Sequence, residues 1–221
     1  MNAEIDHLVV AARTLDEGVA WCEATLGITP GGGGQHALMS THNRLFSIAS
    51  AAFPRAYFEI IAIDPQAPPP GRPRWFDLDD GNLQGTLEQG PQLVHWVARM
   101  DAIEPAVAAL AALGIGRGRV LEASRGALRW RISVRDDGQR LMDGALPTLI
   151  EWDIAHPAEA MPASGVALES LTLRATDPLP LQCALNTIGV NAVEVQAGAT
   201  ALTARLRTPL GVVTLTSCRR R

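Results

Sequence analysis

The sequence has no long apolar run, little cysteine and no excess of positive charge. No apolar segment reaches the roughly 18 residues that a membrane-spanning helix needs, so we expect no membrane span. Lysine and arginine together number 19, against 23 aspartate and glutamate residues, which gives a net charge of −4. This balance argues against nucleic acid as the main partner, because phosphate binding depends on a basic surface.

Cysteine is scarce in this sequence. The three cysteines, Cys22, Cys183 and Cys218, are too few and too scattered for a disulfide framework or a CxxC metal site. The N-terminus opens into a strand-like segment without the basic and apolar regions of a secretory signal. A reducing, cytoplasmic setting is therefore expected. Walker, dinucleotide-binding and zinc-protease motifs are also lacking, which weakens kinase, dehydrogenase and hydrolase interpretations.

An internal repeat is the strongest signal that the sequence does contain. Three segments each open with a short apolar strand, continue with an amphipathic helix and then run into strand-like stretches. The opening strands are predicted at 5–10, 93–97 and 168–173, and the helices end at Gly27, Gly114 and Gly189. The helix starts carry capping signals, which are Thr14 with Glu17, Asp101 with Glu104, and Asp177 before Pro178.

The repeat divides the chain into three predicted modules of strand, helix and about three strands. The first βαβββ module covers residues 1–63, the second covers 92–154, and a third, ligand-free module covers 166–218. Residues 64–91 form a Pro/Gly-rich linker, in which extended or irregular backbone is expected. Within the first module the run 31–36 (GGGGQH) is interpreted as a flexible loop.

Histidine and glutamate recur at matching places in the first two modules. The opening strand 5–10 (IDHLVV) contains His7, and the closing strands 57–61 (YFEII) and 147–152 (PTLIEW) contain Glu59 and Glu151. These segments resemble the vicinal oxygen chelate superfamily, which includes glyoxalase I, methylmalonyl-CoA epimerase and extradiol dioxygenases. The run 40–43 (STHN) and the segment 74–76 (RWF) further resemble its glyoxalase-like domain branch. The resemblance implies an α+β fold in which tandem βαβββ modules form a cupped mixed sheet, with a third degenerate module at the C-terminus.

The same resemblance implies a metal site in the cup. Matched position by position, it makes His7, Glu59, His95 and Glu151 the candidate ligands of one divalent metal ion. Two imidazoles and two carboxylates suit Zn, Ni, Co, Mn or Fe. The alternative is that each histidine is a hydrogen-bonded core residue and each glutamate faces solvent. The third module has Ser170 in place of histidine, and its closing strand has no carboxylate, so it is expected to bind no metal.

Several further residues are candidates for contacts with a small-molecule ligand. The resemblance makes His42 and Asn43 candidates. Arg129 and Arg131 share one face of a strand, from which they would hold an anionic group if it is the inner face of the cup and would be solvated if it is the outer face. Trp75 is a candidate for stacking on a ligand, although apolar packing is the default for tryptophan.

Three functions remain open at this point. The first is a glyoxalase-like metal-dependent lyase or isomerase that acts on a small carbonyl compound through an enediolate, with Glu151 or Glu59 as the base. The second is a metal-free protein of the same fold that binds or sequesters a small molecule. The third is a non-haem iron dioxygenase with His7, His95 and Glu151 as its ligands. The third module is expected to pair with a second copy in a homodimer, or else to cover the back of the first two modules.

Overall fold

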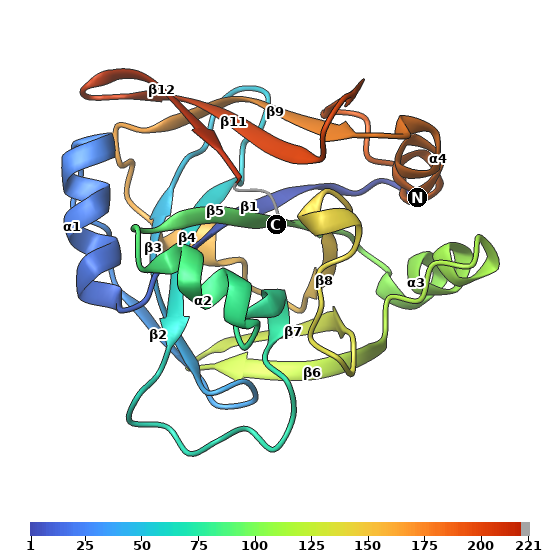
Figure 1. The fold of residues 1–221 in the computed structure, drawn as a ribbon, viewed down its shortest axis with the longest axis horizontal. Helices are drawn as coiled ribbons and strands as arrows, with labels where there is room; N and C mark the ends of the chain where they lie inside the picture. Colours follow the sequence, from blue (N-terminus) through green and yellow to red (C-terminus); the bar gives the residue numbers. More distant parts are fainter. Residues whose placement is uncertain (218–221) are drawn as a thin grey trace.

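Two β-sheets organise the chain (Figure 1), and this computed structural model describes residues 1–217. The larger sheet has the strand order β2-β3-β4-β1-β5-β8-β7-β6, and the smaller has the order β10-β9-β11-β12. The strands of the larger sheet are β1 (Glu4–Ala11), β2 (Gly33–His36), β3 (Thr41–Ser47), β4 (Tyr57–Ile63), β5 (Gln92–Arg99), β6 (Arg119–Arg125), β7 (Leu128–Val134) and β8 (Thr148–Trp152). Those of the smaller sheet are β9 (Ala167–Ala175), β10 (Glu194–Ala197), β11 (Ala201–Thr208) and β12 (Gly211–Thr216). The run predicted as a flexible loop at 31–36 therefore contains a strand, β2.

One helix follows the opening strand of each module, as the repeat predicted. These helices are α1 (Leu15–Leu26), α3 (Ile103–Ala112) and α4 (Pro178–Ile188). Thr14 accepts a hydrogen bond from the backbone of Glu17, and Asp177 caps α4 in the same way, which confirms those two start signals. The start predicted at Asp101 is wrong, because Ala102 occupies the N-cap position of α3 and supplies no side-chain cap.

The larger sheet is a nearly closed cup made by the first two modules. Strands β1 and β5 pair antiparallel at its centre, and each pairs in parallel with the closing strand of its own module, β4 or β8. The two edge strands, β2 and β6, approach each other at the rim. Side chains from successive residues of β1 enter two different cores: Leu8 and Val10 face the back of the sheet, whereas Val9 and Ala11 face the interior of the cup. The predicted α+β class with tandem βαβββ modules is confirmed.

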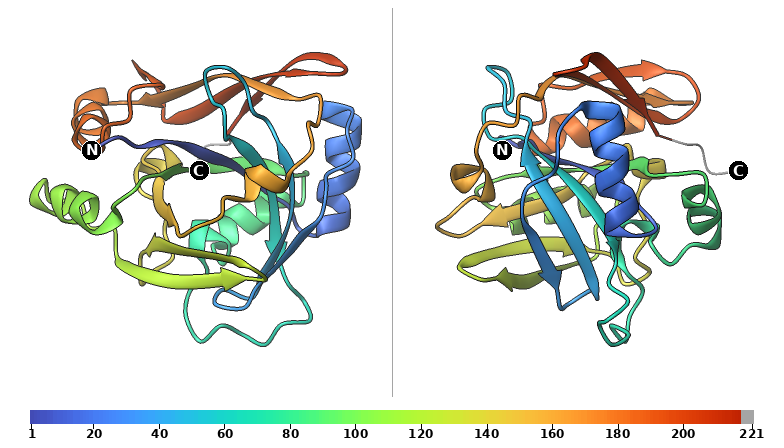
Figure 2. Two further views of the ribbon diagram at one scale, coloured as in Figure 1. Left: turned by 180° about the vertical axis from the view of Figure 1, so that it is seen from behind. Right: turned by 90° about the vertical axis from the view of Figure 1, so that its left-hand side faces the viewer.

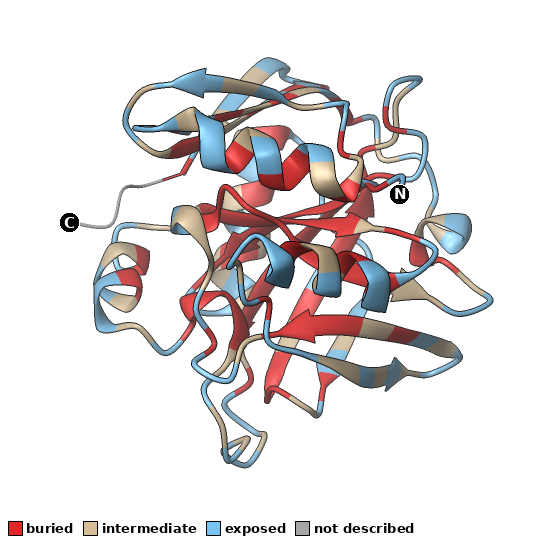
Figure 3. Cartoon of the chain, turned by 90° about the vertical axis from the view of Figure 1, so that its right-hand side faces the viewer, coloured by how far each residue is buried: buried red, intermediate tan, exposed pale blue. Residues whose placement is uncertain are grey.

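The third module covers the back of the cup. Figures 1 and 2 show the smaller sheet lying over β1 and β5, and Figure 3 shows the buried residues concentrated between the layers. Leu171 and Leu173 of β9 share a core with Leu8 of β1 and Trp96 of β5, and α4 packs beside α3. The opposite face is polar, with Arg205 paired to Glu169. Within the described residues, the apolar face of this sheet lies against the first sheet, so the reason for expecting a homodimer falls away.

The linker between the first two modules fills the cup. It contains a short 3₁₀ turn, Trp75–Asp77, and a seven-residue helix, α2 (Gly81–Leu87), which begins at Asp80 as its N-cap. Leu78, Leu83 and Leu87 are buried in the same core as the inward side chains of both modules. The linker is thus more regular than its proline content indicated. Phe76 and Asp77 adopt left-handed backbone conformations, with φ of 60° at both.

Two further 3₁₀ segments, Met142–Gly144 and Pro157–Ala160, complete the described elements. No helix within residues 1–217 combines the length and the apolar character that crossing a membrane requires. Cys22 is buried and Cys183 is exposed, and both are free thiols. Cys218 lies outside the described residues.

Candidate active site in the cup

A small cavity of about 30 Å³ lies inside the cup. Polar side chains from four strands of the first module line it, and residues of the linker and of the second module, most of them aromatic, form the rest of its wall. The lining includes His7 from β1, His36 from β2, Asn43 from β3, Tyr57 and Glu59 from β4, Arg125 from β6, and the aromatic residues Trp75, Phe76, Trp130 and Trp152. The cavity is therefore a polar pocket within an otherwise apolar barrel.

A chain of two buried carboxylates and one imidazole forms the polar wall. His7 Nδ1 lies 2.6 Å from Asp6 Oδ1, and His7 Nε2 lies 3.5 Å from Glu59 Oε2. The pairing register between β1 and β5 shifts between Ile5 and His7, so Asp6 is the extra residue of a bulge. This bulge allows two consecutive residues to join one network. Asp6 also accepts hydrogen bonds from Trp152 Nε1 and His156 Nε2, each at 2.9 Å.

Asn43 connects this chain to the edge of the cup. Its Nδ2 group donates to Glu59 Oε1 at 2.6 Å and to His36 Nε2 at 3.2 Å. Its Oδ1 atom accepts from the backbone of Gly34 at 3.0 Å and from Arg125 Nη1 at 2.9 Å. Two donors on Oδ1 fix the orientation of the amide, and a donor facing His36 Nε2 requires a neutral imidazole there.

These contacts set the protonation states of the site. Burial alone would lower the pKa of His7, but the hydrogen bonds with Asp6 and Glu59 outweigh it and raise that pKa to about 9. Burial would raise the pKa of Glu59, but His7, His36 and Asn43 lower it to about 2. Burial lowers the pKa of His36 to about 4. At neutral pH the site therefore holds an imidazolium between two carboxylates, beside a neutral His36.

The second module contains a diverged copy of this site. In the pairing of β1 with β5, His7 faces Val97 and Val9 faces His95, so His95 occupies the place of His7. Glu59 lies beside Val9, and Thr148 lies beside Val97, so Thr148 replaces Glu59. His95 Nε2 lies 3.0 Å from Thr148 Oγ1 and accepts from the Thr148 backbone at 3.1 Å, while Nδ1 lies 3.1 Å from the carbonyl oxygen of Gly144.

The charge of His95 differs from that of His7 because its surroundings differ. Burial, followed by the positive charges of Arg117 and Arg140, lowers the pKa of His95 well below its ordinary value. Val94 replaces Asp6 at the corresponding bulge, so no carboxylate from that position offsets burial. His95 is therefore a neutral residue whose two ring nitrogens are both occupied by protein hydrogen bonds.

Glu151 lies on the other face of β8. Its Oε2 atom accepts a hydrogen bond at 2.8 Å from the backbone of Ile103, the first residue of α3, and its Oε1 atom pairs with Arg131 Nη2 at 2.5 Å. Glu151 thus supplies the helix cap that Asp101 was predicted to provide. The structure brings His7 and Glu59 together and gives His95 and Glu151 other partners.

The remaining candidates are divided between the cavity and the outside. Asn43 and Trp75 line the cavity, and the indole Nε1 of Trp75 is buried without a hydrogen-bond partner. His42, the neighbour of Asn43 on β3, is half-buried and does not line the cavity. Arg129 and Arg131 line a groove of about 510 Å³ on the outer side of the cup, together with Glu151.

Comparison with known proteins agrees with this architecture. The sequence profile of the family described as "Glyoxalase-like domain" matches residues 5–189. The chain belongs to this family. This family is a branch of the vicinal oxygen chelate superfamily, so the predicted superfamily is confirmed. No curated protein matches the chain.

Solved structures resemble this glyoxalase-like protein in fold. A hypothetical protein from Staphylococcus aureus is 14% identical, with 98% of this chain and 85% of that chain covered and a TM-score of 0.61. Methylmalonyl-CoA epimerase from Mycobacterium tuberculosis is 16% identical over 69% of this chain and 88% of its own, with a TM-score of 0.41. The Streptomyces coelicolor epimerase, in complex with 2-nitronate-propionyl-CoA, is 16% identical over 70% of this chain and all of its own, with a TM-score of 0.43.

The four implied metal ligands do not fit one ion in this glyoxalase-like chain. His95 has both nitrogens hydrogen-bonded, and Glu151 caps a helix on the opposite face of its strand. Among residues 1–217, no group of three or more histidine, cysteine, aspartate or glutamate side chains has the geometry of a metal site. The dioxygenase triad of His7, His95 and Glu151 is separated for the same reason.

Sequence reasoning missed several residues of the site. Asp6 precedes His7 directly, and its charge in an apolar strand was a signal that went unused. His36 ends a glycine run that was interpreted as a loop. Thr148 carries no charge, and Arg117 and Arg125 lie outside the apolar pattern, so nothing local in the sequence linked these three to the cup.

Proposed function

We propose that this protein is an enzyme that moves a proton next to the carbonyl group of a small molecule, as an isomerase or lyase of glyoxalase type. The observation that carries the proposal is the buried chain Asp6–His7–Glu59, which opens on a cavity in the cup. Buried charges are costly, and a group with a strongly shifted pKa in a cavity is typical of a catalytic site.

His7 would stabilise negative charge on the substrate. Because its pKa is raised to about 9, it is protonated at neutral pH, and its Nε2–H faces Glu59 beside the cavity. A carbonyl oxygen that accepts this hydrogen bond becomes polarised, and the enolate that follows is stabilised by a positive charge in a water-poor site. Asp6 holds the ring from its Nδ1 side, which fixes the direction of Nε2.

Glu59 would act as the base. While it is paired with His7, its pKa is about 2 and it is a weak base. Once the substrate oxygen takes the hydrogen bond of His7, Glu59 loses its main stabilising partner and burial raises its pKa. The carboxylate can then accept the proton from the carbon next to the carbonyl and return it to the same or a neighbouring carbon. Asn43 keeps the carboxylate in place through Oε1.

The substrate has to displace side chains to enter. A cavity of about 30 Å³ holds little more than two water molecules, since one water needs roughly 10–15 Å³. Leu45 and Arg125 line both this cavity and a larger outer groove of about 860 Å³. Arg125 therefore lies on the route from the groove to His7 and Glu59.

Proton exchange in D₂O tests this proposal. Small aldehydes and ketones are incubated with the protein, and loss of the proton signal next to the carbonyl is followed by NMR. Glu59→Gln is expected to slow exchange by about 10²–10⁴-fold, because it removes the base but keeps the shape. Glu122→Gln, an exposed carboxylate on β6, is the matched control. Equal exchange by wild type and Glu59→Gln contradicts the proposal, as does exchange that needs added Zn, Ni, Co, Mn or Fe.

A metal-free binding protein is the second candidate, and the larger outer groove, of about 860 Å³, favours it. The groove is lined largely by apolar and small residues, including Ile28, Phe46, Leu128 and Met161, which suits an apolar ligand. Tight binding of a hydrophobic compound in this groove, with no exchange by any carbonyl substrate, would support this alternative.

A further inference from the structure

The second module contains a buried positive charge without a negative partner. Arg117 precedes β6 and is only 4% exposed. Its Nη2 group donates to Thr148 Oγ1 at 3.2 Å, and its buried Nε has no hydrogen-bond partner. Among residues 1–217, no carboxylate forms an ion pair with Arg117. Buried arginines are normally paired, because an isolated charge in a protein interior is strongly unfavourable.

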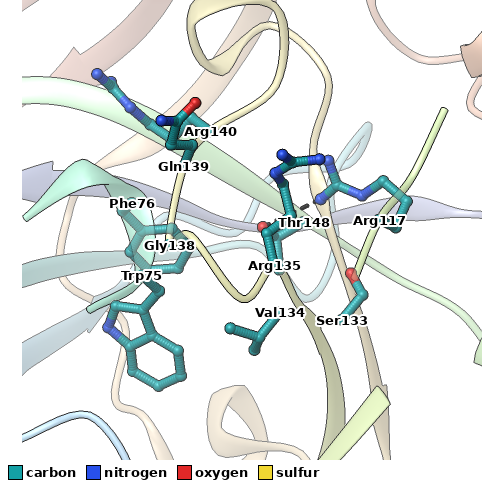
Figure 4. Close-up of a pocket in the computed structure, with 10 residues that line it drawn as sticks. All are labelled: Trp75, Phe76, Arg117, Ser133, Val134, Arg135, Gly138, Gln139, Arg140 and Thr148. Carbon is teal, nitrogen blue, oxygen red and sulfur yellow. Dashed lines mark hydrogen bonds between the residues drawn. The ribbon is translucent and has the colours of Figure 1, made fainter. Parts of the chain in front are cut away.

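Two further arginines surround the same spot. A second cavity, of about 10 Å³, is lined by Arg117, Arg135, Arg140, Ser133, Thr148 and Phe76, among others. Figure 4 shows the Arg117 and Arg135 side chains close together beside Thr148, with Trp75 and Phe76 on another side. Arg140 is neutralised by Asp77 and Arg135 by Asp137, which leaves the charge of Arg117 unbalanced.

The surroundings of this cavity suit a small anion. The lining offers guanidinium groups and the hydroxyl group of Ser133, and guanidinium binds carboxylate with two parallel hydrogen bonds. Burial and the charge of Arg135 lower the pKa of Arg117 to about 9. The pKa of a buried cation is lowered in this way when no negative group lies beside it. A volume of about 10 Å³ admits one group near the size of water, so a carboxylate end fits better than a phosphate.

The second cavity lies close to the proton-transfer residues. Thr148 contacts both Arg117 and His95, and His95 sits diagonally across from His7 on the paired strands β5 and β1. Diagonal neighbours in such a pair are about 7–8 Å apart. Trp75 and Phe76 line both cavities and form the partition between them.

We propose that Arg117 binds the carboxylate of the substrate, so that the substrate class is a short oxo acid in which two or more carbons separate the carboxylate from the carbonyl group. Its carboxylate lies against Arg117 and Ser133, and its carbonyl lies against His7 and Glu59. The identity of the carbonyl end rests on the proposed function, whereas the carboxylate site rests on Arg117 alone. Binding of such a molecule requires Phe76 to move, because its ring separates the two ends.

Calorimetric titration with acetate, 4-oxopentanoate, butanone and inorganic phosphate tests the site. Wild type is expected to bind acetate and 4-oxopentanoate more tightly than butanone. Arg117→Gln is expected to weaken both carboxylates by about ten- to a hundredfold, the usual effect of losing a charged hydrogen-bond partner, and to leave butanone unchanged. Arg129→Gln, an exposed arginine on the outer face, is the matched control.

The outcomes separate this inference from the proposed function. Arg117→Lys retains the charge and is expected to restore part of the carboxylate affinity, which guards against loss of folding in Arg117→Gln. Acetate binding that depends on Arg117, without proton exchange, supports the site and contradicts only the proposed function. Equal carboxylate affinity in wild type and Arg117→Gln overturns the inference, and so does a wild-type protein that binds phosphate but no carboxylate.

Discussion

The raised pKa of His7 predicts a specific dependence of stability on pH. The pKa of His7 is about 9 in the folded protein, against 6.5 for an unperturbed histidine, so the folded chain binds this proton more tightly than the unfolded chain does. The stabilisation is therefore fully present below pH 6.5 and is lost as the pH rises through about 9. The difference of about 2.5 pKa units corresponds to about 3 kcal/mol of unfolding free energy, at 1.36 kcal/mol for each unit.

Urea denaturation at a series of pH values between 6.5 and 9 measures this effect. The unfolding free energy of the wild type is expected to decline across this range, and His7→Gln is expected to be less stable at pH 6.5 with a much flatter profile. His36→Gln is the matched control, because the pKa of His36 is lowered to about 4 and the residue is neutral throughout the range. If His7→Gln declines as steeply as the wild type, the imidazolium between Asp6 and Glu59 does not exist in solution.

Three other predictions follow from contacts described above. Glu151→Gln is expected to lower the unfolding free energy by about 1–2 kcal/mol, because it weakens the cap of α3 and the ion pair with Arg131. If the variant instead loses proton-exchange activity and keeps its melting temperature, Glu151 belongs to the catalytic residues. Phe76→Ala is expected to lower the unfolding free energy, measured by urea denaturation, by about 3–5 kcal/mol, because the ring is buried. Phe76→Gly is expected to lower it by no more than Phe76→Ala does, because glycine tolerates a φ of 60°. Light scattering is expected to give a monomer near 23.5 kDa, because the third module buries its apolar face against its own chain; a dimer at all concentrations would contradict this packing argument.

The sequence was sufficient to predict the modules because their signals are local. Capping residues, helical periodicity and C-terminal glycines lie within a few residues of one another, so they identified α1, α4 and the repeat itself. The same local pattern placed His7 and Glu59 on strands that pair directly. Asn43 was a candidate only through the resemblance to the superfamily, and in the structure its side chain donates a hydrogen bond to Glu59.

The second half of the site was not predictable because it depends on register. A shift of one residue in a strand turns every side chain to the other face, and the β1–β5 pairing contains bulges on both sides of its centre. Glu151 looked equivalent to Glu59 because it was the carboxylate available in the closing strand. The register makes Thr148 the equivalent residue, three positions earlier, and turns Glu151 outward.

The linker could have been recognised as structured from its own residues. Asp80 is a good N-cap, and the apolar residues Leu83 and Leu87 follow at helical spacing. The prolines before them dominated the interpretation. What the sequence did not reveal is where the segment goes, since nothing local indicates that it turns into the cup.

The path of the linker determines how the molecule can be divided. A connector between two domains usually runs over the surface, and the domains on either side can then be produced separately. Here Leu78, Leu83 and Leu87 are core residues for both modules at once, and the third module completes the core on the opposite side of β1 and β5. The modules are repeats in sequence but not folding units, so a chain cut within 64–91 would leave each half with part of its interior missing. Because the modules share their cores, we expect the chain to unfold in a single transition.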